Sequence, residues 1–383
     1  MRSAFYRKVL PRLGLALCLA AAVAFLVSPG GNAASPVGEL TTGKVSLQSA
    51  TALAFGPDGI LFVADSMGGS VVALDTNDRT APRMAQKINV QGIDAKIAGL
   101  LGTTPDQIMV NDLTVNPISK NAYLAVSRGR GPDAVPVIVS VDATGKLTQL
   151  PLDNIRNSVL SLSDAPASDT AARQNPRMQT VTDMDFTNGK LYVSGLSSEE
   201  WASALRSIPF PFDKADKGTN IQIWHASHGR FETNAPVRTF VPYTIAGQPY
   251  ILAAYTCTPL VKIPVSDLKP GTQIKPATIA DVGAGNQPLD MVPYRKDGRE
   301  FILISNSRRG IMKMNADNME NYEAVDSPEQ PNKENGYIFG MPYDTIENLK
   351  GVTQLAGVDA VNAMILSQPA PTDAMNLTTV ALP

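Results

Sequence analysis

Short apolar runs separated by turn residues recur along most of the chain. Between Thr51 and Asp75, three such runs are separated by a Pro-Asp-Gly turn at 57–59 and by a second turn at 65–69. Apolar runs of a few residues, bounded by Gly, Asp and Pro, predict short antiparallel strands joined by tight turns. We therefore expect three neighbouring strands of one sheet in this segment.

The same pattern returns five more times. In each copy two apolar runs flank a turn, and these turns fall near positions 119, 188, 247, 297 and 357. The repeat length is about 50 to 70 residues, which exceeds the roughly 40 to 50 residues of a propeller blade. We assign the excess to insertions near 92–107, 163–177 and 197–218.

Two of these insertions carry signals of their own. Residues 92–107 place apolar side chains at helical spacing, which predicts a short helix. Residues 197–218 include Ile208-Pro-Phe-Pro-Phe212, whose prolines are expected to prevent a regular strand. Two interpretations of Trp201, Phe210 and Phe212 stay open: they form a lid or docking patch over the channel, or they pack down on the ring.

Short strands at even spacing predict an all-β fold, and specifically a β-propeller. Six copies of the pattern favour six blades. Residues 319–346 fit the pattern poorly and leave seven blades as an alternative. A β-helix or a pair of β-sandwiches is the alternative to a propeller. The segment 37–48 belongs to no copy, and we expect this N-terminal strand to close the ring as the outer strand of the last blade.

Residues 1–34 have the pattern of a cleaved secretory signal peptide. Four basic residues and no acidic one precede or adjoin an apolar run from 13 to 27, which is followed by Pro-Gly-Gly-Asn and two alanines. The run is shorter than the about 20 residues of a membrane-spanning helix, which disfavours a retained anchor. We therefore expect a single propeller domain at 35–383, located in the periplasm or secreted, with no stable membrane span after cleavage.

Composition excludes several classes of protein. The chain has 33 Lys and Arg against 35 Asp and Glu, and this balance argues against a nucleic-acid binder. Two cysteines and two histidines exclude a disulfide framework, an iron–sulfur cluster and a Cys-rich zinc site. Only Cys257 would remain after cleavage of the signal, so the exported protein could form no internal disulfide.

The first copy of the repeat has a family resemblance. Its opening, Phe55-Gly-Pro-Asp-Gly-Ile-Leu-Phe-Val-Ala-Asp-Ser66, resembles a blade of the NHL-repeat or regucalcin/gluconolactonase type, over a stretch that ends at Asp75. In regucalcin-type propellers, metal ligands come from the starts of the inner strands. The resemblance implies that Asn111, Asp183 and Asp290 occupy comparable places, whereas Thr51 departs from the expected acidic or amide ligand.

Polar residues are expected to gather at the channel face, where inner strands start and the loops between second and third strands return. The predicted site consists of Asp65, Asn111, Asp112, Arg128, Arg130, Asp183, Trp201, Cys257, Asp290, Asn306 and Arg308. Oxygen ligands such as Asn111, Asp183 and Asp290 suit Ca²⁺ or Mg²⁺, and arginines suit a carboxylate or phosphate. The alternative is structural: aspartates here accept backbone hydrogen bonds and fix loops.

The cysteine and the two histidines are expected to lie on different faces of the ring. Cys257 on the channel face could bind a soft metal or act as a nucleophile, or it is simply a buried small side chain. His225 and His228 follow 221–224, which we expect to be a third strand, so they should lie toward the opposite face and outer rim. There we expect His228 or Glu232 to fix the neighbouring blade rather than to bind metal.

Three functions remain as hypotheses. The first is an exported propeller that binds a periplasmic protein or a small anionic ligand at its channel face through Asp112, Asp183, Asp290, Arg128 and Arg308. The second is a divalent-metal hydrolase, lactonase-like, with Asp183 or Asp290 as ligand or base. The third is an accessory subunit of a periplasmic redox system, which would depend on a partner because the chain has no haem-attachment motif. Whether the protein is an enzyme stays open.

Overall fold

The computed structural model describes residues 40–383 apart from 85–86, 170–173, 258 and 327–337. The chain divides into two units, Met1–Ser35 and Pro36–Pro383, and every described residue belongs to the second. The signal peptide predicted for residues 1–34 therefore lies outside the described residues. Within the described part, no helix is long and apolar enough to cross a membrane.

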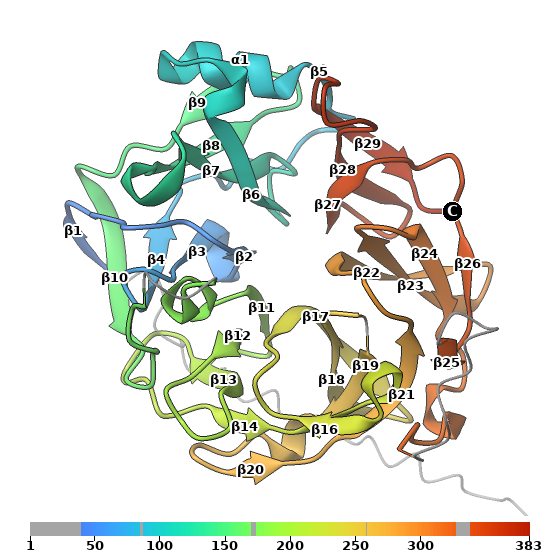
Figure 1. The fold of residues 1–383 in the computed structure, drawn as a ribbon. Coiled ribbons are helices and arrows are strands. Elements are labelled where there is room, and N and C mark those ends of the chain that lie inside the picture. Colours follow the sequence, from blue (N-terminus) through green and yellow to red (C-terminus); the bar gives the residue numbers. More distant parts are fainter. Residues whose placement is uncertain (1–39, 85–86, 170–173, 258, 327–337) are drawn as a thin grey trace, which may run out of the picture. The chain divides into compact units, whose positions relative to one another are not determined.

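The regular secondary structure of the described residues is almost entirely β, with six sheets arranged as the blades of a propeller (Figure 1). This confirms the predicted fold class and the count of six blades. We number the blades by the position of their innermost strand in the sequence, and we give the strands of each blade from the channel outward.

Blades 1 to 3 use the following strands. Blade 1 consists of β2 (Leu53–Phe55), β3 (Ile60–Asp65), β4 (Ser70–Asp75), β10 (Ile155–Ser161) and β1 (Thr41–Gly43). Blade 2 consists of β6 (Ile108–Val115), β7 (Ala122–Arg128), β8 (Val135–Val141) and β9 (Leu147–Gln149). Blade 3 consists of β11 (Asp183–Thr187), β12 (Lys190–Leu196), β13 (Ser203–Pro209), β14 (Thr219–Ile221) and the parallel strand β20 (Gln273–Ile274).

Blades 4 to 6 complete the ring. Blade 4 consists of β17 (Val237–Ile245), β18 (Gln248–Tyr255), β19 (Pro259–Pro264), β21 (Ala277–Val282) and β25 (Ile338–Gly340). Blade 5 consists of β22 (Pro288–Lys296), β23 (Arg299–Asn306), β24 (Gly310–Asn315) and β26 (Tyr343–Thr345). Blade 6 consists of β27 (Val352–Gly357), β28 (Asn362–Ser367), β29 (Asn376–Ala381) and β5 (Asn89–Gln91). Outside the blades lie helix α1 (Ile93–Leu101) and a hairpin of β15 (Ile223–His225) and β16 (Arg230–Glu232).

The blades do not follow one another around the ring in sequence order (Figure 1). The innermost strand β2 contacts both β6 and β11, and β27 contacts both β6 and β22. Since β17 lies between β11 and β22, the order around the ring is blade 2, 1, 3, 4, 5, 6 and back to 2. Blade 1 therefore separates blade 2 from blade 3, although blades 2 and 3 are consecutive in the sequence.

Two long connections produce this order. After β4 the chain runs to the outer edge of blade 6, where β5 pairs with β29. It then builds blade 2 and returns to the outer edge of blade 1, where β10 pairs with β4. The expectation for 37–48 is corrected by these pairings: β1, which comes from that segment, pairs with β10 in blade 1, and β5 is the outer strand of the last blade.

The stretch 319–346, which left a seventh blade open, supplies outer strands to existing blades. In its described part, β25 pairs with β21 in blade 4 and β26 pairs with β24 in blade 5. Each of these strands has only three residues, so neither carries the alternating apolar pattern from which strands are predicted.

Apolar side chains fill all six interfaces between neighbouring blades. Successive side chains of a strand point to opposite faces, so each middle strand serves two interfaces. Phe62 of β3 packs toward blade 3, whereas Leu61 and Val63 pack toward blade 2. The predicted helix is α1, whose Ile93 and Ile97 are buried at the interface of blades 2 and 6.

Several predicted turns have the expected geometry. Asn188-Gly189, Ala246-Gly247 and Asp297-Gly298 join the first and second strands of blades 3, 4 and 5, and all six residues have positive φ between 47° and 77°. Such two-residue turns match the twist of the strands that they connect. Glycine at the second position avoids the steric cost of a Cβ in this conformation.

The assignment of strands in blade 3 is corrected. Ser203–Pro209, inside the range expected to be an irregular insertion, forms β13 and pairs with β12 along its whole length. Pro209 ends the strand and therefore removes no internal hydrogen bond of the sheet. The range 221–224 is consequently not a third strand: Ile221 ends β14, the fourth strand, and β15 begins at Ile223.

Candidate functional site

A polar cavity of about 250 Å³ lies in the channel where the inner strands begin. Four residues predicted for the site, Asn111, Asp112, Asp183 and Asp290, line it together. A second cavity of about 240 Å³ continues along the inner strands and shares the three aspartates. The structure therefore brings these acidic residues together in the channel, as expected. The inner strand of blade 2 begins earlier than predicted, at Ile108, so Asp112 lies inside β6 beside a register shift.

Each of the three aspartates ties two blades together. One carboxylate oxygen accepts the N–H of the next residue, at 2.8 Å for Asp112, 2.7 Å for Asp183 and 2.8 Å for Asp290. The other oxygen accepts an N–H from the inner strand of a neighbouring blade, at 2.6, 2.8 and 2.7 Å; the donors are Leu53, Phe240 and Leu355. Each of the six carboxyl oxygens therefore accepts a backbone N–H, which is the structural role expected of these aspartates if they bind no metal or ligand.

The arrangement is threefold in a sixfold ring. The aspartates belong to blades 2, 3 and 5, which alternate with blades 1, 4 and 6 around the channel. Each reaches the next blade in the same rotational sense, so the bonds join blades 2 and 1, 3 and 4, and 5 and 6. A Ca²⁺ or Mg²⁺ ion among Asn111, Asp183 and Asp290 would have to share oxygens already used in these bonds, and that site remains a prediction.

The enclosed channel makes these carboxyls hard to ionise. Burial, reinforced by repulsion from Asp183, raises the pKa of Asp112 to about 8, and burial raises the pKa of Asp183 to about 7. Burial and the charges of Asp112 and Asp183 also raise the pKa of Asp290. Asp185, further along β11 and absent from the predicted site, has its pKa raised to about 7 by burial and by Asp183.

These shifts predict that the protein is less stable at pH 8.5 than at pH 5. Asp112 and Asp183 have a pKa of 3.8 in the unfolded chain and of about 8 and 7 in the folded protein. At pH values between these limits the two carboxyls are protonated only in the folded state, so the free energy of unfolding falls as pH rises. Because the side chains are partly open to the channel, we expect a fall of roughly 2 kcal/mol, or about 3 °C in the melting temperature of a domain of this size.

Thermal melts across this range test the prediction. Asp183→Asn should flatten the pH dependence between pH 5 and 8.5, whereas Asp153→Asn, at a site whose side chain is 88% exposed, should leave it unchanged. A melting temperature that stays constant or rises over this range would contradict the assignment.

Arg238 was missed in the sequence. It lines the channel cavity beside the three aspartates, at the start of β17, and burial lowers its pKa. With the Gln287 amide oriented so that its oxygen faces Arg238, that oxygen accepts from Nε at 2.9 Å and from Nη2 at 2.6 Å. Arg238 precedes Thr239 at a register shift of β17 as Asn111 precedes Asp112 at a register shift of β6, so aligning the six copies could have identified it.

The other arginines predicted for the site do not line this cavity. Arg128 donates to the carbonyl of Leu101 at 3.3 Å, and Arg130 donates to the carbonyls of Asp106 and Ile108 at 2.8 and 3.1 Å. Both therefore bind the segment that runs from the end of α1 to the first residue of β6. Arg308 also lies outside the set of cavity-lining residues.

Two more predicted residues shape loops. Asp65, 3% exposed, accepts the N–H groups of Gln48, Ser49 and Gly68 at 2.8–2.9 Å. Asn306 accepts the N–H groups of the two residues that follow Ser307, at 3.0 and 3.1 Å. Neither lines the channel cavity.

The aromatic residues of 197–218 do not form one lid. Phe210 and Phe212 pack on Phe62, with ring centroids 4.9 and 5.7 Å away, and so fill the interface of blades 1 and 3. Trp201 lies apart from them in the turn between β12 and β13, where its carbonyl accepts from Asn220 at 2.6 Å. For the two phenylalanines, the interpretation that they pack down on the ring is therefore correct.

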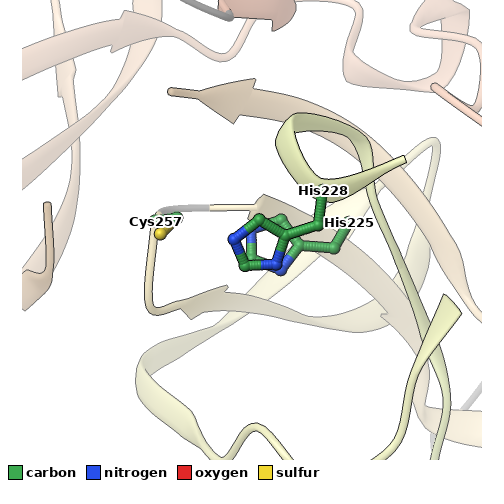
Figure 2. A group of neighbouring side chains, drawn as sticks. All are labelled: His225, His228 and Cys257. Atoms are coloured by element: carbon green, nitrogen blue, oxygen red, sulfur yellow. The ribbon is translucent and has the colours of Figure 1, made fainter. Parts of the chain in front are cut away.

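The expected separation of Cys257 from the histidines is wrong. The hairpin of β15 and β16 packs on blade 4, and it brings His225 and His228 to the loop that carries Cys257 (Figure 2). One ligand atom from each of the three residues lies within 4.8 Å of the other two. The error arose from the strand assignment, because a third strand at 221–224 would have ended at the opposite face.

Glu232 binds both imidazoles. Its Oε2 is 2.7 Å from Nδ1 of His225, and its Oε1 is 2.8 Å from Nδ1 of His228. The two rings lie one over the other with centroids 3.7 Å apart, and the thiol of Cys257 lies across from them on a separate loop (Figure 2). The expected fixing role of Glu232 is thus exerted on the histidines of its own hairpin.

Charge within the cluster favours a thiolate. The interaction of the thiol with the His225 ring lowers the pKa of Cys257 against the opposing effect of burial. Burial lowers the pKa of His225, but the thiol, Glu232 and Asp281 outweigh it and raise the pKa to about 9. The His225 hydrogen bond, with help from His228, lowers the pKa of Glu232 to about 2.

A larger, open cleft lies near the turns that end the inner strands of blades 3 to 5. It has about 550 Å³ and is lined by four tyrosines, by Arg295 and by Glu300. Glu300 accepts from the hydroxyl of Tyr243 and from Arg295, so these three side chains of the cleft bind one another. No sequence motif had singled it out.

The sequence matches no protein-family model and no curated protein. Similar solved structures include a glucose dehydrogenase, 10% identical, with 90% of this chain and 99% of that chain covered and a TM-score of 0.33. An engineered GH43 glycoside hydrolase is 11% identical with a TM-score of 0.35 over 72% of this chain, which spans about half (52%) of that protein. A PQQ-bound aldose sugar dehydrogenase from Streptomyces coelicolor is 10% identical, with 90% and 97% covered and a TM-score of 0.30.

The propeller assignment rests on the strand pairing of this chain itself. The activities and the cofactor named above are properties of those proteins. The NHL-repeat or regucalcin-type affiliation remains a prediction, whereas the propeller architecture that it implied is observed.

Proposed function

We propose that this chain is a ligand-binding propeller that holds a small hydroxy- or amino-carboxylate in its channel cavity. One observation carries the proposal: three carboxyls from alternate blades and the guanidinium of Arg238 line the same cavity of about 250 Å³. The proposed ligand is still a small anion, as expected from the sequence, but its cationic partner is Arg238 instead of Arg128 and Arg308.

The chemistry of the cavity has two parts. Arg238 presents a planar set of N–H donors that suits a carboxylate, and Gln287 fixes its orientation by accepting two of its bonds. The oxygens of Asp112, Asp183 and Asp290 each accept one backbone bond and retain further acceptor capacity for hydroxyl or ammonium donors. A ligand that combines an anionic group with such donors satisfies both parts.

Catalysis by the same cavity is a separate hypothesis. The pKa of Asp183, raised by burial to about 7, lies near that of an effective general base. Its oxygens, however, are held at 2.7 and 2.8 Å by backbone N–H groups, which favours a fixed structural carboxyl over a mobile base. We therefore propose binding, with lactone and ester hydrolysis to be assayed alongside it.

Isothermal titration with gluconate, glucose and small amino acids tests the proposal. We expect the carboxylate-bearing compounds to bind, and Arg238→Gln to weaken their binding by about tenfold or more because one charge-assisted contact is lost. Arg130→Gln is the matched control, since Arg130 binds loop carbonyls outside the cavity and its loss should leave affinity unchanged. Binding of glucose as tight as that of gluconate, or equal effects of both variants, would contradict the proposal.

A further inference from the structure

We propose that His225, His228 and Cys257 form a binding site for a late first-row transition-metal ion, copper or zinc. This site is separate from the channel cavity and does not depend on the function proposed for it. The sequence analysis had set the histidines aside because a third ligand was missing, and the fold supplies that ligand from another loop (Figure 2).

The ligand atoms are already gathered. They lie within 4.8 Å of one another, compared with about 3.5 Å between ligands around a tetrahedral zinc ion with bonds of about 2.0 to 2.3 Å. The His228 side chain is 39% exposed, so it has room to move inward by the remaining distance. The rest of the set is rigid, because His225 is only 2% exposed and the Cys257 N–H donates to the carbonyl of Asn286 at 2.8 Å.

Glu232 orients the imidazoles for metal binding. Its two oxygens occupy Nδ1 of both rings at 2.7 and 2.8 Å, which leaves the Nε2 atoms as the ligands. Metal-bound histidines characteristically hold a carboxylate or carbonyl on the other ring nitrogen, which fixes the tautomer and makes the ligand more basic.

The buried Nε2 of His225 is independent evidence for a missing ligand. Among the described residues no hydrogen bond of normal length and angle reaches it, although the Cys257 thiol lies nearby, and an unsatisfied buried polar atom is costly. Its nearest carboxylate oxygen, Oδ2 of Asp281, is 3.9 Å away and accepts the N–H of Ser227 at 3.0 Å. A metal ion between His225 and Cys257 would satisfy this atom.

The donor set selects the metal. One thiolate and two imidazoles suit copper and zinc, whereas Ca²⁺, Mg²⁺ and Mn²⁺ prefer oxygen ligands. Three protein ligands leave a position for water or an external ligand. Since both proposed metals share this chemistry, the experiment has to distinguish them.

Metal titration of the purified full chain, stripped with a chelator, tests the site. We expect one equivalent of Zn²⁺ or Cu⁺ to bind, and Co²⁺ as a zinc probe to give a thiolate-to-metal charge-transfer band in the near ultraviolet. Cys257→Ser should abolish the band, and His228→Ala, at an exposed position that does not endanger folding, should weaken binding by at least about tenfold. Competition between the two ions then shows which is preferred.

Arg230→Ala is the matched control. Arg230 contacts the same Glu232 oxygen as His228, at 3.0 Å, but offers no metal ligand, so its loss should leave affinity unchanged. The proposal is overturned if neither ion binds, if Cys257→Ser and His228→Ala bind like the wild type, or if alkylation of Cys257 is as fast with Zn²⁺ or Cu⁺ as without. The last result would identify the cluster as a free thiol–imidazole pair. Loss of metal binding would leave the gluconate titration unaffected, so the two proposals fail separately.

Discussion

Replacing Arg206 with alanine is expected to lower the free energy of unfolding by about 3–5 kcal/mol. Arg206 lies in β13 and is 1% exposed. Its Nε donates to Asp164 at 2.8 Å, and its other nitrogens donate to the carbonyls of Thr180 and Leu196 at 3.1 and 2.9 Å. Removal of the guanidinium leaves the Asp164 carboxylate, also 1% exposed, buried without its counter-charge.

Denaturant unfolding of the variant and of a surface pair measures this effect. Lys44 and Asp153 form an ion pair of 3.3 Å, but their side chains are 69% and 88% exposed, so Lys44→Ala should cost at most about 1 kcal/mol. The double replacement Arg206→Met with Asp164→Leu should recover part of the loss, because no uncompensated charge remains. Equal costs for Arg206→Ala and Lys44→Ala would show that the buried pair has no special role.

The ion pair also explains how the polar segment 163–177 is held. This segment reads as a loop in the sequence, yet Asp164 fixes its first turn from both sides. One carboxylate oxygen binds Arg206, and the other accepts the N–H of Gly218 at 3.0 Å. Charged residues within a loop give no indication of burial unless their partners are known, and Arg206 is 42 residues away in the sequence.

Local structure was largely predictable from the sequence. The paired strands, the turns at Asn188-Gly189 and Asp297-Gly298 and the short helix at Ile93–Leu101 follow from periodicity and turn chemistry, which are properties of adjacent residues. The outer strands were not predictable in the same way. Strands β5 and β26 have three residues each, too few to show a period, and their place is set by edges that distant segments leave open.

Some residues of the candidate sites were likewise predictable from the local pattern, and others were not. Asp112, Asp183 and Asp290 were found because each occupies the same position of the repeat, just before the apolar run of an inner strand. The cluster of Cys257 with the histidines was missed because it depends on where β15 lies relative to blade 4. Because 221–224 was predicted to be a third strand, His225 was placed on the face opposite Cys257, and the two residues were not expected to meet.

The unusual blade order can be tested through Phe62. This side chain in blade 1 is fully buried, with its ring centroid 4.9 Å from that of Phe210, which follows β13 of blade 3. Phe62→Ala should lower the free energy of unfolding by about 3–5 kcal/mol, because a large apolar side chain is lost and the interface cannot close around the cavity. Phe231→Ala, at a ring that is 49% exposed, should cost far less.

A double-mutant cycle tests whether blades 1 and 3 are neighbours by measuring the coupling free energy between Phe62 and Phe210. If blades 1 and 3 are neighbours, Phe62→Ala and Phe210→Ala should be coupled by about 0.5–3 kcal/mol, as expected for residues in contact. Phe301, in blade 5, belongs to a different apolar cluster, so its combination with Phe62→Ala should be additive within about 0.5 kcal/mol. In a ring that followed the sequence, blade 2 would separate blades 1 and 3, and both cycles would be additive. Coupling confined to the Phe62–Phe210 pair therefore requires the observed order, in which β10 returns to blade 1 before blade 3 begins.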